Sequence, residues 1–317
     1  MAVLDTVLHS TLTKSRKKLI MASIKSNALV AWAFANKRVD FEDGGHEITN
    51  PLTVGRNPNI GSYSYYGTVP VDQTNEFTTI TYAWARVAGS VIISDQEEDE
   101  NRGSSEIFKL MKAKIDVLEE SIKEKFSDYL YGSGTGSDPN GLGNLIPDDP
   151  TSGTLGGISR VTESQWRTSS YDFDGSLDST TIEEAFDDVL LDLTLKSESP
   201  DVILSGRNFI RMYRAAVRDK GIIDLGASNS GKKMMDLGFA GTSHGGKAML
   251  YDEDCNVNKA FFINSKYLRL CILRHVNMRV KELTSPWNMD ARGRRVVWQG
   301  QWCLWKAYRT HGVVINE

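Results

Sequence analysis

The feature that most constrains this fold is a long amphipathic segment that runs directly into a glycine-rich stop. Across residues 101–131, apolar side chains recur every three or four positions, the spacing that places them along one face of an α-helix. About thirty residues at roughly 1.5 Å each make a rod of roughly 45 Å, whereas helices in globular proteins average about eleven residues. A rod with one apolar face has to lie on a sheet or on a neighbouring subunit. The pattern is therefore typical of a shell-building protein, and the stripe consists of Ile107, Met111, Ile115, Leu118, Ile122, Phe126, Tyr129 and Leu130.

Both ends of this predicted helix carry matching signals. The acidic run at residues 95–100 precedes it, and negative charge is favourable at the positive end of a helix dipole. Gly132, Gly134 and Gly136 follow it, and Pro139 comes soon after. Because glycine and proline both end helices, the rod is expected to stop at Tyr131.

Composition and charge place the chain among ordinary globular proteins. The 317 residues are 40% hydrophobic and 25% charged, with a net charge of −4, whereas a generic nucleic-acid binder would carry a strong basic excess. No apolar run approaches the roughly 18 residues that span a bilayer, so no membrane partner is expected. Cys255, Cys271 and Cys303 show no CxxC pairing, which indicates free, mostly buried thiols in a reducing compartment.

Residues 1–38 form a basic arm with seven Lys or Arg residues and a single acidic residue, Asp5. Residues 28–35 are apolar and end in an Ala-x-Ala pattern, but residues 25–27 interrupt the continuous core that a signal peptide requires. Apolar residues at i, i+4 steps, including Ala28 and Trp32, instead predict an amphipathic helix. The basic charge leaves two interpretations open: docking on an acidic partner or nucleic acid, and a solvated helix face.

Residues 44–94 are expected to form a long two-stranded arm. Residues 77–84 are rich in β-branched and aromatic side chains, as a strand should be. Residues 67–71 are a second candidate strand, with Pro70 favouring an edge position, and residues 51–55 and 57–61 contain turn residues. An isolated hairpin is only marginally stable in water, so this arm should lie on a neighbour. The aromatic residues expected to contact a neighbouring subunit are Tyr65, Tyr66, Phe77 and Trp84.

The second half of the chain predicts a compact α/β region followed by a closing sheet. Apolar periodicity predicts helices over residues 180–197 and 207–219, with a short buried strand at residues 201–204 between them. Further strands are expected at residues 248–251 and 260–263. The densest strand-like runs cover residues 268–283 and 295–315.

Residues 226–233 nearly match the phosphate-binding loop GxxxxGK[ST]. The final position should be Ser or Thr, whose hydroxyl binds Mg²⁺, but here it is Lys233. The segment also leads into further glycine instead of opening a helix. A flexible, exposed loop across residues 226–246 is therefore the favoured interpretation.

Residues 172–178 resemble part of a calcium-binding loop, because oxygen-bearing side chains occupy alternate positions. An EF-hand places glycine sixth and a bidentate Glu twelfth, whereas Gly175 is fourth and Glu183 is twelfth from Asp172. A turn leading into the next helix explains the pattern better. The five histidines are scattered, so no catalytic, metal or cofactor site is predicted and the chain is not expected to be an enzyme.

The order of these elements resembles the major capsid proteins of tailed bacteriophages, which share the Hong Kong 97-type fold. The resemblance implies an α+β fold with an N-terminal arm, an extended β-hairpin loop, a peripheral domain with a long spine helix and an axial α/β domain. It is carried by the order of the segments more than by any one motif. Those segments are residues 132–136, 139–142, 200–205, 212–221, 269–283 and 295–314.

The resemblance implies boundaries for these parts. Residues 1–38 correspond to the N-terminal arm and residues 39–94 to the extended loop with its strands. The peripheral domain would contain residues 95–178 and 269–317, and the axial domain residues 179–268. The loop that contains Gly226, Lys232, Lys233 and Gly238 would face the axis of a ring of subunits.

By the same resemblance, copies of the chain form pentamers and hexamers of an icosahedral shell that encloses double-stranded DNA non-specifically. Only about forty residues precede the extended loop, which is too few for a built-in scaffolding domain. The resemblance therefore implies a separate scaffolding protein or an already processed chain, and Met1 favours the former. A portal is a further partner, and the resemblance also allows a decoration protein. The shell would be assembled in the host cytoplasm and become part of the virion. Two alternatives stay open, an encapsulin-type compartment filled with protein cargo and a nucleotide-binding enzyme that uses residues 226–231.

Overall fold

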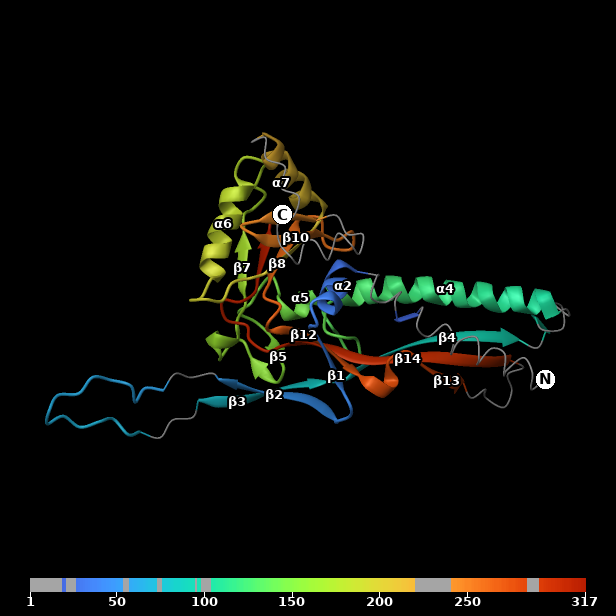
Figure 1. The fold of residues 1–317 in the computed structure, drawn as a ribbon, viewed down its shortest axis with the longest axis horizontal. Helices are drawn as coiled ribbons and strands as arrows, with labels where there is room; N and C mark the ends of the chain where they lie inside the picture. Colours follow the sequence, from blue (N-terminus) through green and yellow to red (C-terminus); the bar gives the residue numbers. More distant parts are fainter. Residues whose placement is uncertain are drawn as a thin grey trace.

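The chain is an α+β protein whose longest helix and a separate hairpin project in opposite directions from a central body (Figure 1). The computed structural model describes residues 19–20, 27–53, 57–72, 76–94, 96–97, 104–219, 241–283 and 291–317. Two large sheets hold most of the strands, and the long helix lies on one of them.

The first large sheet supports the long helix. It contains β1 (Val39–Glu42), β12 (Leu268–Leu273), β14 (Ala291–Leu304), β13 (Arg279–Leu283) and β4 (Ala85–Ser94). β14 pairs with β4 in antiparallel fashion over ten positions, and β1 runs parallel to β12. Segments from the beginning and the end of the sequence therefore build one surface.

The predicted rod is present as α4 (Ser104–Tyr131) and lies along β4 and β14 (Figure 1). Ile115, Leu118 and Ile122 in its apolar stripe are buried within the chain itself. Phe126 meets Trp298 of β14 edge to face, with 4.8 Å between the ring centroids. Of the two supports that the sequence allowed, a sheet and a neighbouring subunit, this part of the stripe rests on the sheet.

The glycine-rich stop works by close backbone approach. A Cβ atom on Gly141 would lie 2.2 Å from the carbonyl oxygen of Gly132 and 2.4 Å from that of Tyr129. Only glycine allows the chain to fold back this tightly against the last turn of α4. The short helix α5 (Leu142–Leu145) follows at once.

The second large sheet has the strand order β7-β15-β11-β8-β10-β9. Its strands are β7 (Ser169–Asp172), β15 (Gly312–Ile315), β11 (Lys259–Ile263), β8 (Val202–Ser205), β10 (Lys247–Tyr251) and β9 (Gly241–His244). Helices α6 (Ile182–Leu193) and α7 (Arg207–Asp219) cover one face, where Phe186 packs against Phe209 and Phe262. β7 and β15 come from segments that the sequence analysis assigned to the peripheral domain, yet they pair in this sheet.

The opposite face of the second sheet joins the larger core, which includes α2 (Ala28–Ala35). The sequence predicted an amphipathic helix here, but residues 28–33 are all buried, so α2 is a core helix. Asn27 caps it by accepting a hydrogen bond from the Leu29 amide at 2.9 Å. The remainder of the predicted N-terminal helix, apart from residues 19–20, lies outside the described residues.

The projecting hairpin consists of β2 (Glu47–Thr53) and β3 (Phe77–Ala83), which pair with each other in a two-stranded sheet. The prediction of a strand at residues 67–71 was wrong, since the structure has no strand there. Residues 51–53, where turn residues were expected, instead belong to β2, the partner of β3. Ile48 and Leu52 of β2 face the core, whereas Val69 and Val71 are both exposed and would bury nothing as strand residues. Pro51 lies inside β2, in a two-stranded sheet where a strand edge tolerates a missing N–H.

The remaining elements are short. They are β5 (Thr154–Leu155), β6 (Ile158–Ser159) and the 3₁₀ turns at Ser164–Trp166 and Arg274–Val276. Among the described residues, no helix is both long and apolar enough to pass through a membrane.

Candidate subunit-contact surfaces

The loop beyond the hairpin presents aromatic side chains that have no core of their own to enter. Tyr65 is 93% exposed and Tyr66 is 95% exposed, and their rings meet edge to face at 5.5 Å. Phe77, at the start of β3, is also exposed. Three of the four residues predicted to contact a neighbour therefore lie on open surface. The loop exposes further apolar residues that the prediction did not name, and these are Ile60, Tyr63, Val69 and Val71.

A pair of hydrogen bonds holds the two branches of this loop together. The side-chain Nδ2 of Asn59 donates to the backbone carbonyl oxygen of Asp72 at 2.6 Å. In return, the backbone amide of Asp72 donates to Asn59 Oδ1 at 3.0 Å. The Gly67 amide donates to the Ser64 carbonyl oxygen at 2.8 Å and forms a turn near the tip. The loop thus has its own internal structure while it remains exposed.

Trp84 differs from the other three predicted contact residues. It is only partly exposed, packs against the large core, and donates from Nε1 to the Gly45 carbonyl oxygen at 3.1 Å. Its position at the base of the hairpin anchors the arm to the body. The predicted ring-axis residues Gly226, Lys232, Lys233 and Gly238 lie outside the described residues, as does the phosphate-loop-like segment.

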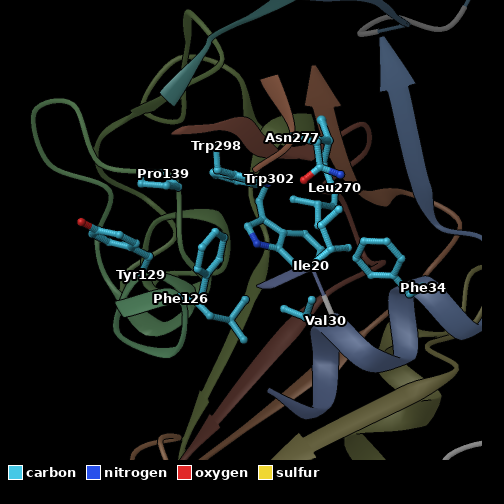
Figure 2. Close-up of a pocket in the computed structure, with 12 residues that line it drawn as sticks. Ile20, Val30, Phe34, Phe126, Tyr129, Pro139, Leu270, Asn277, Trp298 and Trp302 are labelled. Carbon is cyan, nitrogen blue, oxygen red and sulfur yellow. The ribbon is translucent and has the colours of Figure 1, made fainter. Parts of the chain in front are cut away.

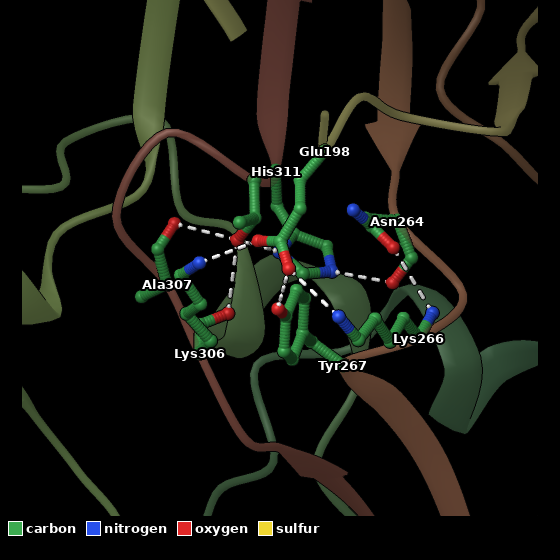
Figure 3. A network of polar contacts seen from close by, with 8 residues as sticks. Glu198, Asn264, Lys266, Tyr267, Lys306, Ala307 and His311 are labelled. Atoms are coloured by element: carbon green, nitrogen blue, oxygen red, sulfur yellow. Dashed lines mark hydrogen bonds and ion pairs between the residues drawn. The ribbon is translucent and has the colours of Figure 1, made fainter. Parts of the chain in front are cut away.

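One carboxylate joins two of the segments that connect the large sheets. Glu198 lies in the turn after α6 and accepts hydrogen bonds from Lys266 Nζ at 2.7 Å and from Lys306 Nζ at 2.6 Å (Figure 3). The Tyr267 hydroxyl donates to the same carboxylate. Lys266 and Tyr267 lie between β11 and β12, and Lys306 lies between β14 and β15.

The electrostatics of this junction favour an ionised Glu198. Partial desolvation raises the pKa of Glu198, but the hydrogen bonds from Lys266, Lys306 and Tyr267 together outweigh it and lower the pKa to about 2. The carboxylate is therefore charged at every physiological pH. It holds the two connecting segments to the end of α6.

A fully buried histidine lies in the same junction (Figure 3). His311 Nε2 is 3.2 Å from the Asn264 carbonyl oxygen, and Nδ1 is 2.8 Å from the Thr310 hydroxyl. The Asn264 carbonyl can only accept, which assigns the proton of the neutral ring to Nε2. The Thr310 hydroxyl also lies 3.0 Å from the carbonyl oxygens of Lys306 and Ala307, to which it can donate. Desolvation lowers the pKa of His311 to about 3, so the imidazole is neutral near pH 7.

A second junction joins α2 to the sheet that carries α6 and α7. Asp252 follows β10 and is buried, and its Oδ2 accepts a hydrogen bond from the Ala28 amide at 3.2 Å. Desolvation raises the pKa of Asp252. The contact places a carboxylate at the N-terminus of α2, where the helix dipole favours negative charge.

The interior cavity is small and apolar. Val30 and Phe34 of α2, Phe126 of α4, and Trp298 and Trp302 of β14 point toward a common space of about 20 Å³ (Figure 2). That volume fits about one water molecule, whereas ligand pockets measure roughly 300–1,000 Å³. The cavity is a packing gap between α2, α4 and the sheet.

The carboxylates of the calcium-loop-like segment bind backbone amides. Asp172 Oδ1 accepts from the Asp174 amide at 3.1 Å. Asp178 Oδ1 accepts from the amides of Thr180 at 2.7 Å and Thr181 at 3.1 Å. These contacts form a turn and lead into α6, as the sequence favoured. In the part of the chain that the structure describes, no group of three or more His, Cys, Asp or Glu side chains is arranged to hold a metal ion. All three cysteines are free and buried.

Similar solved structures share this arrangement across almost the whole chain. A protein of the cyanophage A-1(L) capsid asymmetric unit matches with a TM-score of 0.69 at 15% identity, covering 92% of this chain and 94% of its own. This is the capsid shell fold. The holo-SrpI encapsulin complex from Synechococcus elongatus PCC 7942 shares the capsid fold with a TM-score of 0.54 at 10% identity, covering 89% of this chain and 86% of its own. The capsid of a native GTA particle matches with a TM-score of 0.52 at 10% identity and covers 90% of each chain.

The predicted resemblance to tailed-phage capsid proteins is therefore confirmed at the level of the capsid fold. Neither a protein-family model nor the sequence of a curated protein matches the chain. The order of helices and strands indicated the capsid fold. That order is shared with these structures even though only 10–15% of the residues are identical. The junction residues Glu198 and His311 were missed, because their partners lie far away in the sequence.

Proposed function

We propose that this chain is the major capsid protein of a tailed bacteriophage and assembles into pentamers and hexamers of an icosahedral shell around double-stranded DNA. The observation that carries the proposal is the similarity to the cyanophage capsid protein over more than nine-tenths of both chains. The exposed aromatic loop beyond β2 and β3 supports it, because Tyr65 and Tyr66 in that loop are left almost fully exposed within the described part of the chain.

In this proposal Tyr65, Tyr66 and Phe77 contact a neighbouring subunit, and Trp84 fixes the base of the arm. Residues 1–38 are the N-terminal arm and residues 39–94 the extended loop. Residues 179–268 form most of the axial domain, and β7 and β15 complete its sheet. The rest of residues 95–178 and 269–317 forms the peripheral domain, and the loop with Gly226, Lys232, Lys233 and Gly238 faces the ring axis.

The proposed partners are further copies of the chain, a separate scaffolding protein, a portal and DNA bound without sequence preference. A decoration protein could bind the outer surface. A net charge of −4 suits a shell lining, because tight binding of each phosphate would hinder DNA movement during packaging. Assembly would take place in the host cytoplasm, and the finished shell would belong to the virion.

An encapsulin-type shell is the second candidate, and the similarity to the holo-SrpI encapsulin supports it with a lower TM-score. The contents of particles isolated from the native source distinguish the two. Nuclease-protected double-stranded DNA inside purified particles is the result expected for a capsid. Particles that contain one abundant enzyme and no DNA would reject the capsid proposal in favour of the encapsulin.

A further inference from the structure

The outward face of α6 is acidic. The helix contains five carboxylate residues and no basic residue. Glu184 and Asp188 lie one turn apart on the exposed side, and neither forms an ion pair or side-chain hydrogen bond among the described residues. Leu191 lies one turn further along and is 72% exposed. This face therefore combines unpaired negative charge with an apolar side chain in water.

The outward face of α7 is basic. Arg207, Arg211, Arg214 and Arg218 follow one another at steps of four, three and four residues, which places them in one stripe along the helix. Phe209 and Tyr213 are buried on the opposite side. In the part of the chain that is described, none of the four guanidinium groups has an ion-pair partner.

The two charged helices, α6 and α7, lie along different flanks of one unit. Phe186 of α6 stacks on Phe209 of α7 with 5.8 Å between ring centroids, so the helices share a core beneath them. In Figure 1 this unit has a triangular outline, with α6 along one flank and α7 along the other. No ion pair among the described residues joins α6 to α7. As far as the described residues go, these complementary charges are available for a contact between molecules.

We propose that the acidic face of α6 in one copy binds the arginine face of α7 in the next copy, head to tail around a ring. This inference rests on the proposed shell function and names the contact that would order its rings. A head-to-tail contact between two different surfaces closes into a ring when the rotation between copies permits it. A triangular unit with opposite charge on its two flanks suits that geometry.

A second copy fits these faces better than nucleic acid does. DNA would be attracted to the arginines, but the acidic flank of the same unit would repel it. The exposed Leu191 would gain nothing from phosphates, whereas a protein surface could bury it. Single exposed ion pairs are weak, but complementary rows of charge fix the register and disfavour wrong pairings.

Charge reversal tests the contact directly. The basic-face variant is Arg211→Glu/Arg218→Glu, and the acidic-face variant is Glu184→Arg/Asp188→Arg. Each variant alone should raise the concentration needed for ring assembly by at least about tenfold, because like charges would then face each other. The variant with all four changes has the net charge of the original chain and should assemble again. Arg211→Lys/Arg218→Lys keeps the charge and should assemble normally.

Mixing the two reversed variants gives a sharper test. Arg211→Glu/Arg218→Glu puts two acidic side chains between and beside Arg207 and Arg214 on α7, and Glu184→Arg/Asp188→Arg makes the outward side of α6 basic. Neither variant should therefore pair well with itself, but the two should alternate around a ring. Strict alternation closes only with an even number of subunits. Co-expression should therefore yield hexamers of alternating composition and no pentamers, as resolved by native mass spectrometry.

Assembly of the unmodified chain distinguishes failure of the proposed shell function from failure of the α6–α7 contact. If it assembles and both charge-reversed variants also assemble normally, the α6–α7 contact is wrong and the shell function stands. If it assembles neither alone nor with its scaffolding protein, the shell function and the contact are both wrong. Normal assembly with reduced DNA content in the Arg211→Glu/Arg218→Glu variant would show that α7 binds nucleic acid, and would overturn the contact.

Neutral substitutions cover the case in which a charge-reversed variant shows altered thermal unfolding. Arg211→Gln/Arg218→Gln and Glu184→Gln/Asp188→Asn then replace the charge reversals. Unchanged assembly of these neutral variants contradicts the proposal, and weakened assembly supports it.

Discussion

The ammonium group of Lys306 lies 2.6 Å from the carboxylate of Glu198, although the two residues are 108 positions apart in the sequence. Lys306 belongs to the segment that leaves the sheet under α4, and Glu198 follows a helix that covers the other sheet. The pair therefore fixes how the two sheets are joined. Lys266 and Tyr267 bring the second connecting segment to the same carboxylate (Figure 3).

Replacing this carboxylate by an amide should loosen the junction. Glu198→Gln leaves two lysines without their counter-charge, and we expect the free energy of unfolding to fall by about 1–3 kcal/mol. Chemical denaturation at pH 7 measures the change. Glu253→Gln, at an exposed position, is the matched control and should change the free energy by less than about 0.5 kcal/mol. Equal effects of the two substitutions would show that the junction contributes no stability.

The buried imidazole of His311 should make the fold sensitive to acid. Its pKa is about 3 in the folded chain, compared with an ordinary value of 6.5, so below pH 6.5 the unfolded chain binds a proton that the folded chain does not. Stability is therefore complete above pH 6.5 and is lost progressively as the pH falls toward 3. Glu198 adds a loss of the same sign between its ordinary value of 4.5 and about 2.

His311→Gln keeps a hydrogen-bond donor but removes the titrating ring. We expect lower stability at pH 7, because the ring leaves a gap, and a flatter dependence of stability on pH between 6.5 and 4.5. Urea titrations at several pH values check the slope. His275→Gln, at an exposed position, is the control and should keep the slope of the original chain. If His311→Gln retained that slope, another group would have to explain the acid sensitivity.

The close packing of α4 on β4 requires a glycine at position 89 of β4. A Cβ atom at Gly89 would lie 2.6 Å from Leu118 Cδ1, so Gly89→Val should push the helix from the strand and cost about 1–3 kcal/mol of stability. Gly44→Val is the control, because nothing lies within 4 Å of its Cβ position. Leu118→Ala in the Gly89→Val chain should recover part of the loss. An additive result for the double variant would mean that the two side chains do not compete for space.

The loop beyond the hairpin should matter for assembly and not for the fold. Tyr65→Ser/Tyr66→Ser should leave the unfolding free energy within about 0.5 kcal/mol of the original, because both rings are in water. Aromatic residues at an interface commonly carry much of its binding energy, so assembly should weaken by at least about tenfold. Val161→Ser, at another exposed apolar position, is the control for surface polarity. A loss of cooperative unfolding in the double tyrosine variant would instead place the loop in the subunit core.

The sequence predicted those parts of the fold that depend on local pattern. The three- and four-residue spacing that defines α4, α6 and α7 is determined by the helix itself, and all three helices form. Residues 67–71 were wrongly predicted as a strand and β2 was not recognised, because strand formation depends on which residues find a core to enter, and Ile48 and Leu52 of β2 do so. His311 could not be recognised, since its partner Asn264 is 47 positions away. The charges on α6 and α7 were visible in the sequence, but their places on separate flanks became apparent only in the folded unit.

Sedimentation velocity of the purified protein, combined with electron microscopy of the same sample, measures whether this chain builds a shell. We expect rings of five and six subunits or closed icosahedral particles, with little free monomer at high protein concentration. A chain that sediments as a folded monomer at every concentration, and shows no rings or particles in the images, would contradict it.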